Sequence, residues 1–315
     1  MKTTIKQLKN EISQHIIGHS EVIDAMLIGL LSKGHVLLEG LPGLAKTKAV
    51  NTLAQTIGLD FKRIQFTPDL LPTDILGTEI YNPRTQSFEL KKGAVFTHLL
   101  LCDEINRSSA KVQSALLEVM QERQVTIGDH SFQVEEPFYV LATQNPIDQE
   151  GTYTLPQAQL DRFMLKIIVG YNNEVEEFEI AKKVANDAFT SVQQILDQET
   201  LQQMQKEVQQ MYVDDALTSY IVKLIFATRE PAKYNLPDLE ETIAYGASPR
   251  ATIDLLKAVK ASAYLRGKEA VSPIDIALCT KNVLRHRIVL SYEAEAEGLS
   301  VDDVIETLMT HIEIG

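Results

Sequence analysis

The sequence predicts an α/β fold, a parallel sheet covered by helices, followed by an all-α domain. Up to residue 170, short apolar segments alternate with segments of helical periodicity, a pattern typical of a mainly parallel sheet. Beyond residue 170 the periodicity is almost entirely helical, with breaks at prolines. We therefore expect an α/β domain over residues 1–170 and an all-α domain over residues 171–315.

Composition and charge narrow the class of protein further. The 315 residues are 44% hydrophobic and carry a formal net charge of −13, which argues against broad nonspecific binding of nucleic acid. No signal segment begins the chain, and no apolar stretch approaches the ~18 residues of a membrane helix, so we expect no membrane insertion. The only cysteines, Cys102 and Cys279, are distant and form no metal-binding spacing, as in a reduced, cytoplasmic protein.

The α/β part begins with helical periodicity from Ile5 to Leu31, interrupted near Gly18. Five short β-prone segments then predict strands, and the segments between them include apolar residues at helical spacing, such as Val112, Leu116 and Val119. The expected strands cover residues 36–39, 61–66, 98–102, 138–142 and 166–169, and the expected helices cover residues 45–57 and 109–121.

Two segments between these elements predict β-hairpins. Residues 79–81 and 87–90 are β-prone and are separated by Asn82-Pro83-Arg84. Residues 125–134 carry Gly128-Asp129 between two β-prone halves. Both hairpins would be additions to the alternating strand and helix pattern.

A glycine-containing loop joins the first strand to the next helix. It reads Gly40-Leu41-Pro42-Gly43-Leu44-Ala45-Lys46-Thr47, and a strand, such a loop, Lys-Thr and a helix are the context of a phosphate-binding P-loop. Backbone N–H groups at the helix start would bind phosphate, with Lys46 on the β/γ-phosphates and the Thr47 hydroxyl on Mg²⁺. Ala45 replaces the second glycine of the general pattern, and a plain turn before a helix is the alternative interpretation.

The strand near residue 100 ends in paired carboxylates, Asp103 and Glu104. Asp103 would hold Mg²⁺, directly or through water, and Glu104 would polarise an attacking water. An Asp-Glu pair is also an ordinary strand terminus. Its position after a P-loop favours the catalytic interpretation.

Three further polar residues lie at the ends of predicted elements. Asn145 follows a strand and can position a water, although Asn-Pro is also a common turn. Arg162 precedes the last strand and is suited to stabilise a transferring phosphoryl group, or alternatively to pair with Asp161. Arg250 stands in the first turn of a helix, where a cation is unfavourable unless an anion or a carboxylate lies nearby.

Together and in this order, the candidate residues resemble the motifs of AAA+ ATPases. They are the loop at residues 40–47, Asp103-Glu104, Asn145, Arg162 and Arg250. Longer segments resemble the MoxR branch of that family, and they extend over nearly the whole chain. These segments are residues 63–75, 103–107, 142–146, 150–153, 158–163 and 246–251.

The resemblance implies an ATP-hydrolysing protein with Mg²⁺ as cofactor and an all-α domain that acts as a lid. It assigns Gly40–Thr47 to Walker A, and Asp103 with Glu104 to Walker B. Thr47 and Asp103 would be the metal ligands. Ile17 and Gly18 match the segment that packs on adenine.

The resemblance also implies roles in hydrolysis for the polar residues. Asn145 matches sensor 1 and Arg250 matches sensor 2. Arg162 matches the arginine finger, which acts on the ATP of a neighbouring subunit, so we expect a homo-oligomer, a hexameric ring. Thr154 and Gln157 depart from the Pro and Glu usual in the family, which leaves open an interface ion pair.

The expected output is chaperone-like remodelling or maturation of a partner protein complex. MoxR proteins are often paired with partners that carry a von Willebrand factor A domain, and the two hairpins are the expected output surfaces. A DNA-directed AAA+ motor and a nucleotide-binding module without turnover are the alternatives. The net charge of −13 disfavours the first, and the presence of Glu104, Asn145 and Arg162 disfavours the second.

Overall fold

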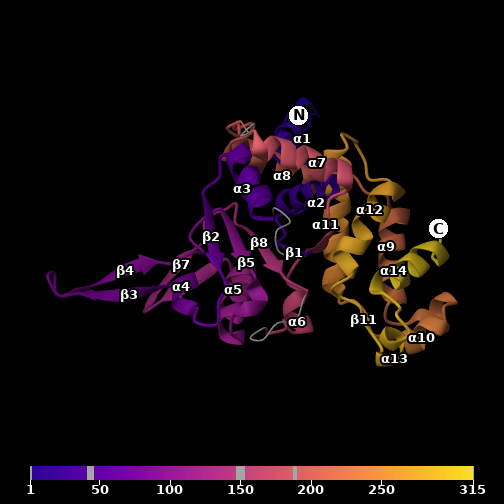
Figure 1. Cartoon of the computed structure of the whole chain (residues 1–315). Coiled ribbons are helices and arrows are strands. Elements are labelled where there is room, and N and C mark those ends of the chain that lie inside the picture. The colour runs from indigo at the N-terminus through magenta and orange to yellow at the C-terminus, as the bar shows by residue number, and fades with distance from the viewer. Residues whose placement is uncertain (1, 41–45, 147–152, 187–189, 315) are drawn as a thin grey trace.

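The computed structural model describes residues 2–40, 46–146, 153–186 and 190–314. Its centre is a five-stranded parallel sheet in the order β2-β5-β8-β1-β9, covered by helices (Figure 1). The predicted α/β fold is therefore confirmed. The strands are β1 (Val36–Gly40), β2 (Phe61–Gln65), β5 (Leu99–Asp103), β8 (Tyr139–Gln144) and β9 (Leu165–Val169).

Helices cover both faces of the sheet, which explains why its central strands are almost continuously apolar. Side chains alternate along each strand, so Leu99 and Leu101 pack into one core and Leu100 and Cys102 into another. The first core contains residues from α1 (Lys2–His15), α2 (Ser20–Leu31) and α3 (Lys46–Ile57), and the second contains residues from α5 (Ala110–Glu122).

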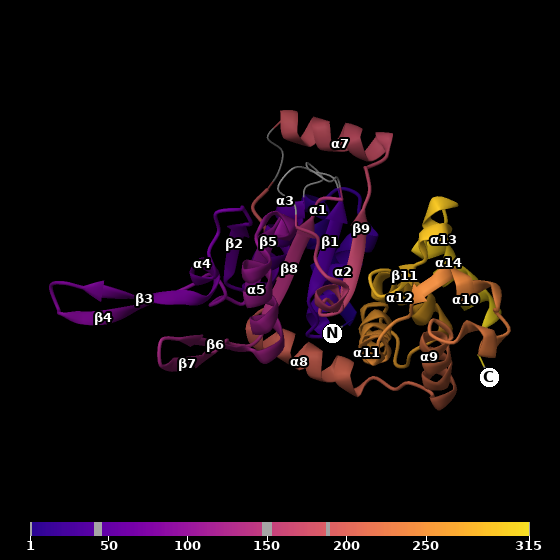
Figure 2. The ribbon, with the colours of Figure 1, turned by 90° about the horizontal axis from the view of Figure 1, so that it is seen from below.

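Both predicted hairpins are present. The first pairs β3 (Gly77–Asn82) with β4 (Ser87–Lys92) after the short helix α4 (Pro72–Leu76), and the second pairs β6 (Gln124–Ile127) with β7 (His130–Gln133). The β3–β4 hairpin projects far from the body of the molecule in both views (Figures 1 and 2). Its base requires glycine, because a Cβ at Gly93 would lie 2.2 Å from the carbonyl oxygen of Ile75.

The C-terminal part is almost entirely helical, as predicted. It also holds a two-stranded pair, β10 (Ile243–Tyr245) with β11 (Val289–Leu290), which is too short to produce a periodic pattern. Its helices are α7 (Glu174–Ala185), α8 (Gln198–Gln210), α9 (Asp215–Ala227), α10 (Asp238–Thr242), α11 (Pro249–Leu265), α12 (Pro273–Leu284), α13 (Tyr292–Ala296) and α14 (Val301–His311), with a 3-10 turn at Pro231–Tyr234. The α/β part also holds the short helix α6 (Gln157–Leu160) and a 3-10 turn at Ile105–Arg107.

Helices α7 and α8 follow the last strand but remain in contact with the α/β part. The Nζ of Lys183 on α7 donates to the carbonyl oxygen of Gln14 at 2.9 Å, and Nε2 of Gln205 on α8 donates to that of Leu30 at 2.8 Å. Figure 2 shows α7 and α8 at opposite ends of the sheet strands, with the α9–α14 bundle to one side. No helix in the described ranges is long and apolar enough to cross a membrane.

Candidate functional site

Several of the residues predicted for nucleotide chemistry converge at one edge of the sheet. Strands β1, β5 and β8 are parallel neighbours, so the segments that follow them meet at their carboxyl ends. Gly40, Asp103 and Gln144 are the last residues of these strands. The phosphate contacts predicted for Leu41, Pro42, Gly43, Leu44 and Ala45 lie outside the described residues.

Lys46 is the first residue of α3 and turns back toward the strand that precedes it. Its Nζ donates to the carbonyl oxygen of Gly40 at 2.6 Å. Partial burial lowers the pKa of Lys46, while the nearby carboxylates, that of Asp103 first, raise it. Gly40 is required, because a Cβ there would lie 2.6 Å from the carbonyl oxygen of Val169. The ammonium group thus lies at the carboxyl end of β1.

Asp103 is the centre of a compact polar cluster and is only 6% exposed. Its Oδ2 accepts from the Thr47 hydroxyl at 3.4 Å and from Nε of Arg63 at 2.6 Å. Its Oδ1 accepts from the Thr143 hydroxyl at 3.2 Å. A carboxylate oxygen beside a hydroxyl is a donor set that suits Mg²⁺, which takes few protein ligands and completes its shell with phosphates and water. The two predicted metal ligands are thus together.

Glu104 follows Asp103 in a left-handed backbone conformation, with φ of +56°. Its N–H donates to the Thr143 hydroxyl at 2.8 Å, and its Oε2 lies 3.0 Å from Nε of Arg107. The carboxylate is therefore held by a cation of its own segment, not by the polar cluster around Asp103.

Two members of this cluster, Arg63 and Thr143, were missed by the sequence analysis, and so was Arg107 beside it. Each stands inside a segment that carried the family resemblance, so a signal was present. The contacts of Arg63 and Thr143 join the neighbouring strands β2, β5 and β8. Periodicity does not reveal which strands are neighbours, and for that reason the roles of these residues could not be read from the sequence.

The other predicted nucleotide contacts lie at the same edge. Asn145 follows β8, and its carbonyl oxygen accepts from Nδ2 of Asn106 at 3.2 Å. Nδ2 of Asn172, just before α7, donates to the carbonyl oxygen of Ile17 at 3.2 Å. A Cβ at Gly18 would lie 2.3 Å from that same Nδ2, and the φ of Gly18 is +73°, so the segment predicted to pack on adenine is tightly fitted against the residues just before α7.

Arg162 lies at the opposite edge. Met164 donates its N–H to the carbonyl oxygen of His35 at 2.8 Å, which places the start of β9 beside the start of β1. Nη1 of Arg162 donates to the carbonyl oxygen of Leu117 at 2.9 Å. The five residues of β1 then separate Arg162 from the loop before Lys46 by roughly 13 Å, at about 3.3 Å per residue.

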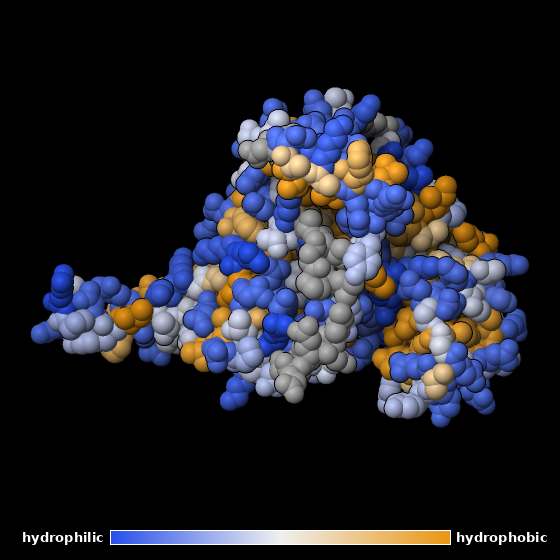
Figure 3. Space-filling model, in the orientation of Figure 1, coloured by the Kyte–Doolittle hydropathy of each residue, from blue (hydrophilic) through white to orange (hydrophobic). Residues whose placement is uncertain are grey.

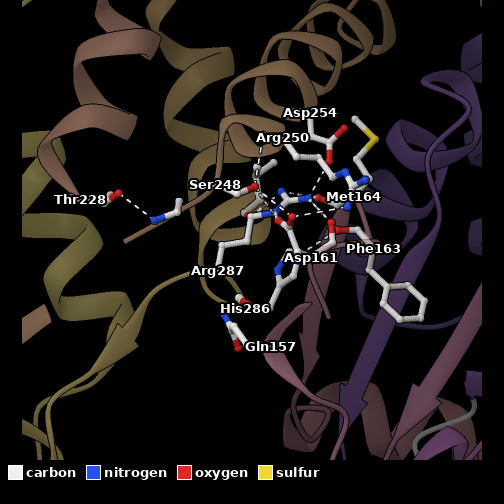
Figure 4. A network of polar contacts seen from close by, with 12 residues as sticks. Gln157, Asp161, Phe163, Met164, Thr228, Ser248, Arg250, Asp254, His286 and Arg287 are labelled. Atoms are coloured by element: carbon white, nitrogen blue, oxygen red, sulfur yellow. Dashed lines mark hydrogen bonds and ion pairs between the residues drawn. The ribbon is translucent and has the colours of Figure 1, made fainter. Parts of the chain in front are cut away.

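Arg250 also lies at this opposite edge, within a network of charged groups (Figure 4). Its Nη1 lies 3.5 Å from Oδ2 of Asp161, and Asp161 also accepts from the Ser248 hydroxyl and from Nε of Arg287. Arg287 reaches Asp254 as well, at 2.6 Å. The carboxylate considered as an alternative partner of Arg250 is therefore Asp161.

The two arginines open onto a basic cavity. It has a volume of about 340 Å³ and lies between the start of β1, the end of α5 and the start of α11. Among the residues that the structure describes, Asp254 is the only acidic residue that lines this cavity, and five basic side chains also line it. These are Lys33, Arg123, Arg162, Arg250 and Lys257. Because basic side chains outnumber acidic ones in its lining, the cavity is suited to bind an anion from another molecule.

The two halves of the chain each match a family model. Residues 35–165 match the ATPase family associated with various cellular activities, and residues 238–308 match the AAA lid domain. The fold and the site thus define a P-loop nucleotide-binding ATPase domain followed by a helical lid.

Relatives of the whole chain narrow this class. The chain is 47% identical to Chaperone MoxR1 of Mycobacterium tuberculosis (97% of this chain, 81% of the relative) and 32% identical to MoxR of Paracoccus denitrificans (90% and 88%). A crystal structure of a candidate ATPase from Cytophaga hutchinsonii superposes with a TM-score of 0.94 at 49% identity, over 99% of this chain and 95% of that one. The chain belongs to the MoxR family of AAA+ ATPases.

Proposed function

We propose that this protein hydrolyses ATP at sites shared between neighbouring copies of the chain. The observation that carries the proposal is the separation of the two groups of residues. Lys46, Asp103 and Glu104 lie at the carboxyl edge of the sheet, while Arg162 and Arg250 lie at the amino edge. A single copy therefore holds Lys46, Asp103 and Glu104 of a catalytic site, and a second copy supplies the two arginines that this site needs for phosphoryl transfer.

At the carboxyl edge, the residues have distinct roles. Lys46 binds the β/γ-phosphates, and Thr47 with Asp103 holds Mg²⁺, which neutralises phosphate charge when bound. Glu104 orients the attacking water and accepts its proton. For this, the carboxylate has to leave Arg107, whose Nε lies 3.0 Å from Oε2 of Glu104. Asn145 positions the same water from the end of β8.

At the amino edge, Arg162 and Arg250 present guanidinium groups to the nucleotide of the next copy. When this head-to-tail contact is repeated from copy to copy, the assembly closes into a ring if the rotation between successive copies adds up to a full turn. We propose a ring of six copies. In this arrangement the basic cavity receives the polyphosphate of the neighbour. Asp161 holds Arg250 near that position at 3.5 Å.

Mixing two inactive variants tests the shared site. Lys46→Ala removes the nucleotide half, and Arg162→Ala removes the arginine half of the contact. Neither alone should turn over ATP, but mixtures should regain activity at sites where an intact Lys46 faces an intact Arg162. An arginine finger contributes on the order of 10³–10⁵ in rate in related hydrolases. Mixtures that stay inactive, or a rate independent of protein concentration, would refute the proposal.

The nucleotide cycle acts, in this proposal, on a partner protein complex through the two hairpins. The name of the mycobacterial relative, Chaperone MoxR1, supports this role. The projecting β3–β4 hairpin exposes Tyr81 and Phe88 at 52% and 68%, and two exposed aromatic side chains at one tip are suited to bind protein. The proposed partner carries a von Willebrand factor A domain.

A further inference from the structure

Helix α7 presents an apolar surface that the described part of the chain does not cover. None of its residues is buried. Val175 and Phe178, which are three residues apart and therefore neighbours on one side of the helix, are 73% and 65% exposed. Exposed acidic residues, Glu174 and Glu177, accompany them. In Figure 3, hydrophobic and hydrophilic colours adjoin on α7 near the top of the molecule. Such a surface on a helix is typical of a contact with another protein.

A groove lined by apolar and basic residues lies between α2, α8 and α11. We call it the α2–α8–α11 groove. It has a volume of about 460 Å³, its apolar surface includes Leu31, Val208 and Leu256, and Ile253 is 54% exposed at its side. No acidic residue in the described part of the chain lines this groove. Its basic residues are Lys33, Lys206, Lys257 and Lys260.

The two surfaces lie at opposite ends of the sheet strands. Helix α7 begins five residues after the end of β9, at the nucleotide edge, where Asn172 contacts Ile17. The groove shares Lys33 and Lys257 with the basic cavity that holds Arg162 and Arg250. Figure 2 shows α7 at one end of the strands and α8 with the end of α11 toward the other.

We propose that α7 of one copy docks into the α2–α8–α11 groove of the next copy. This inference rests on the proposed head-to-tail assembly, because bringing Arg162 of one copy to the nucleotide edge of another also brings the groove to α7. Phe178 enters the apolar part of the groove, and Glu174 and Glu177 face its lysines. The occupant is thus a second copy of this chain, selected by shape and by charge complementarity.

Disulfide formation between two single-cysteine variants tests the contact directly. Phe178→Cys places a thiol on α7, and Ile253→Cys places one at the groove. The native cysteines, Cys102 and Cys279, are buried, so they do not compete. Mixed in ATP under mild oxidation, the two variants should form a covalent dimer. The matched control is Ile274→Cys, which is 58% exposed on α12 outside the groove and should give none with Phe178→Cys.

The outcomes separate this inference from the ATPase proposal. A specific cross-link supports the α7 contact even if the Lys46→Ala and Arg162→Ala mixture stays inactive, and in that case only the shared catalytic site fails. Restored hydrolysis without a cross-link overturns the α7 contact alone. Absence of both overturns both, and a cross-link equal to that of the control overturns the contact.

Two further variants test the chemistry of the contact. Phe178→Ala should raise the protein concentration needed for half-maximal hydrolysis by about 10-fold, as expected for a central interface anchor. Replacing Glu174 and Glu177 by Lys should have a similar effect, and the double change Lys206→Glu and Lys260→Glu in the other partner should reverse it. If Phe178→Ala instead weakens ATP binding to the dilute chain, α7 serves the adenine base and the inference is wrong.

Discussion

Arg287 donates from Nε to Oδ1 of Asp161 at 2.8 Å, and its guanidinium side chain has no exposed surface. Arg287 lies between α12 and β11 in the lid, while Asp161 lies just before β9. The same guanidinium reaches Asp254 on α11 and the carbonyl oxygen of Phe163. One buried cation therefore fixes the lid to the amino edge of the sheet, beside the two arginines proposed to act on a neighbour.

Arg287→Met should destabilise the chain strongly. Removing one partner of a buried ion pair leaves an uncompensated charge and typically costs about 3–5 kcal/mol. Here Asp254 loses the arginine that pairs with it, and Asp161 keeps the longer contact to Arg250 and the Ser248 hydroxyl. Denaturant unfolding followed by circular dichroism measures the loss. The matched control is Arg285→Met, since Arg285 pairs with the more exposed Asp302, and a loss for Arg287→Met no larger than for this control would contradict the prediction.

The destabilisation by Arg287→Met should also depend on pH. Burial raises the pKa of Asp254, and Arg287 opposes that rise, so the variant should raise this pKa further. A carboxyl group with a raised pKa in the folded state favours folding when protonated, and that contribution is lost as the pH rises through the folded pKa. The difference in unfolding free energy should therefore be smaller near pH 4 than near pH 7, and a constant difference would show that Asp254 is not responsible.

The elements that carry Asp103 and Lys46 could be predicted from the sequence, but the surroundings of Arg287 and Arg250 could not, and the reason is physical. The strand ending at Asp103 and the helix beginning at Lys46 follow from local periodicity, and parallel strands bring them together. The buried ion pairs of Arg287 left no local signal, because its two carboxylate partners, Asp161 and Asp254, are more than thirty residues away in sequence. The position of Arg250 opposite the P-loop depends on how the lid packs, which periodicity does not encode.

Glu104→Gln should bind ATP yet hydrolyse it at least ~100-fold more slowly, since a general base contributes about 10²–10⁴ in rate. The amide keeps the size of the side chain but cannot accept a proton. Lys46→Ala should instead lose nucleotide binding, which a fluorescent ATP analogue measures. Hydrolysis by Glu104→Gln at the parental rate would show that another group is the base.

Arg63→Met should lower the Mg²⁺ concentration required for nucleotide binding. The Nε of Arg63 lies 2.6 Å from Oδ2 of Asp103, the same oxygen that accepts from the Thr47 hydroxyl. A guanidinium at this distance competes with Mg²⁺ for the carboxylate and repels it. A Mg²⁺ titration at fixed ATP analogue measures the shift, with Lys62→Met on the same strand as control. A higher Mg²⁺ requirement in Arg63→Met would mean that Arg63 supports the metal site.

Replacing both Tyr81 and Phe88 by Ser should spare basal hydrolysis of ATP and abolish its stimulation by the partner protein. The two rings contact edge to face with centroids 5.4 Å apart, on a hairpin that projects far from the nucleotide edge (Figure 1). Their loss removes apolar surface for a partner without touching Lys46 or Glu104. Tyr292→Ser, at a site 87% exposed on α13, is the control for loss of an exposed aromatic ring. If the hairpin variant keeps full stimulation, the output surface lies elsewhere on the molecule.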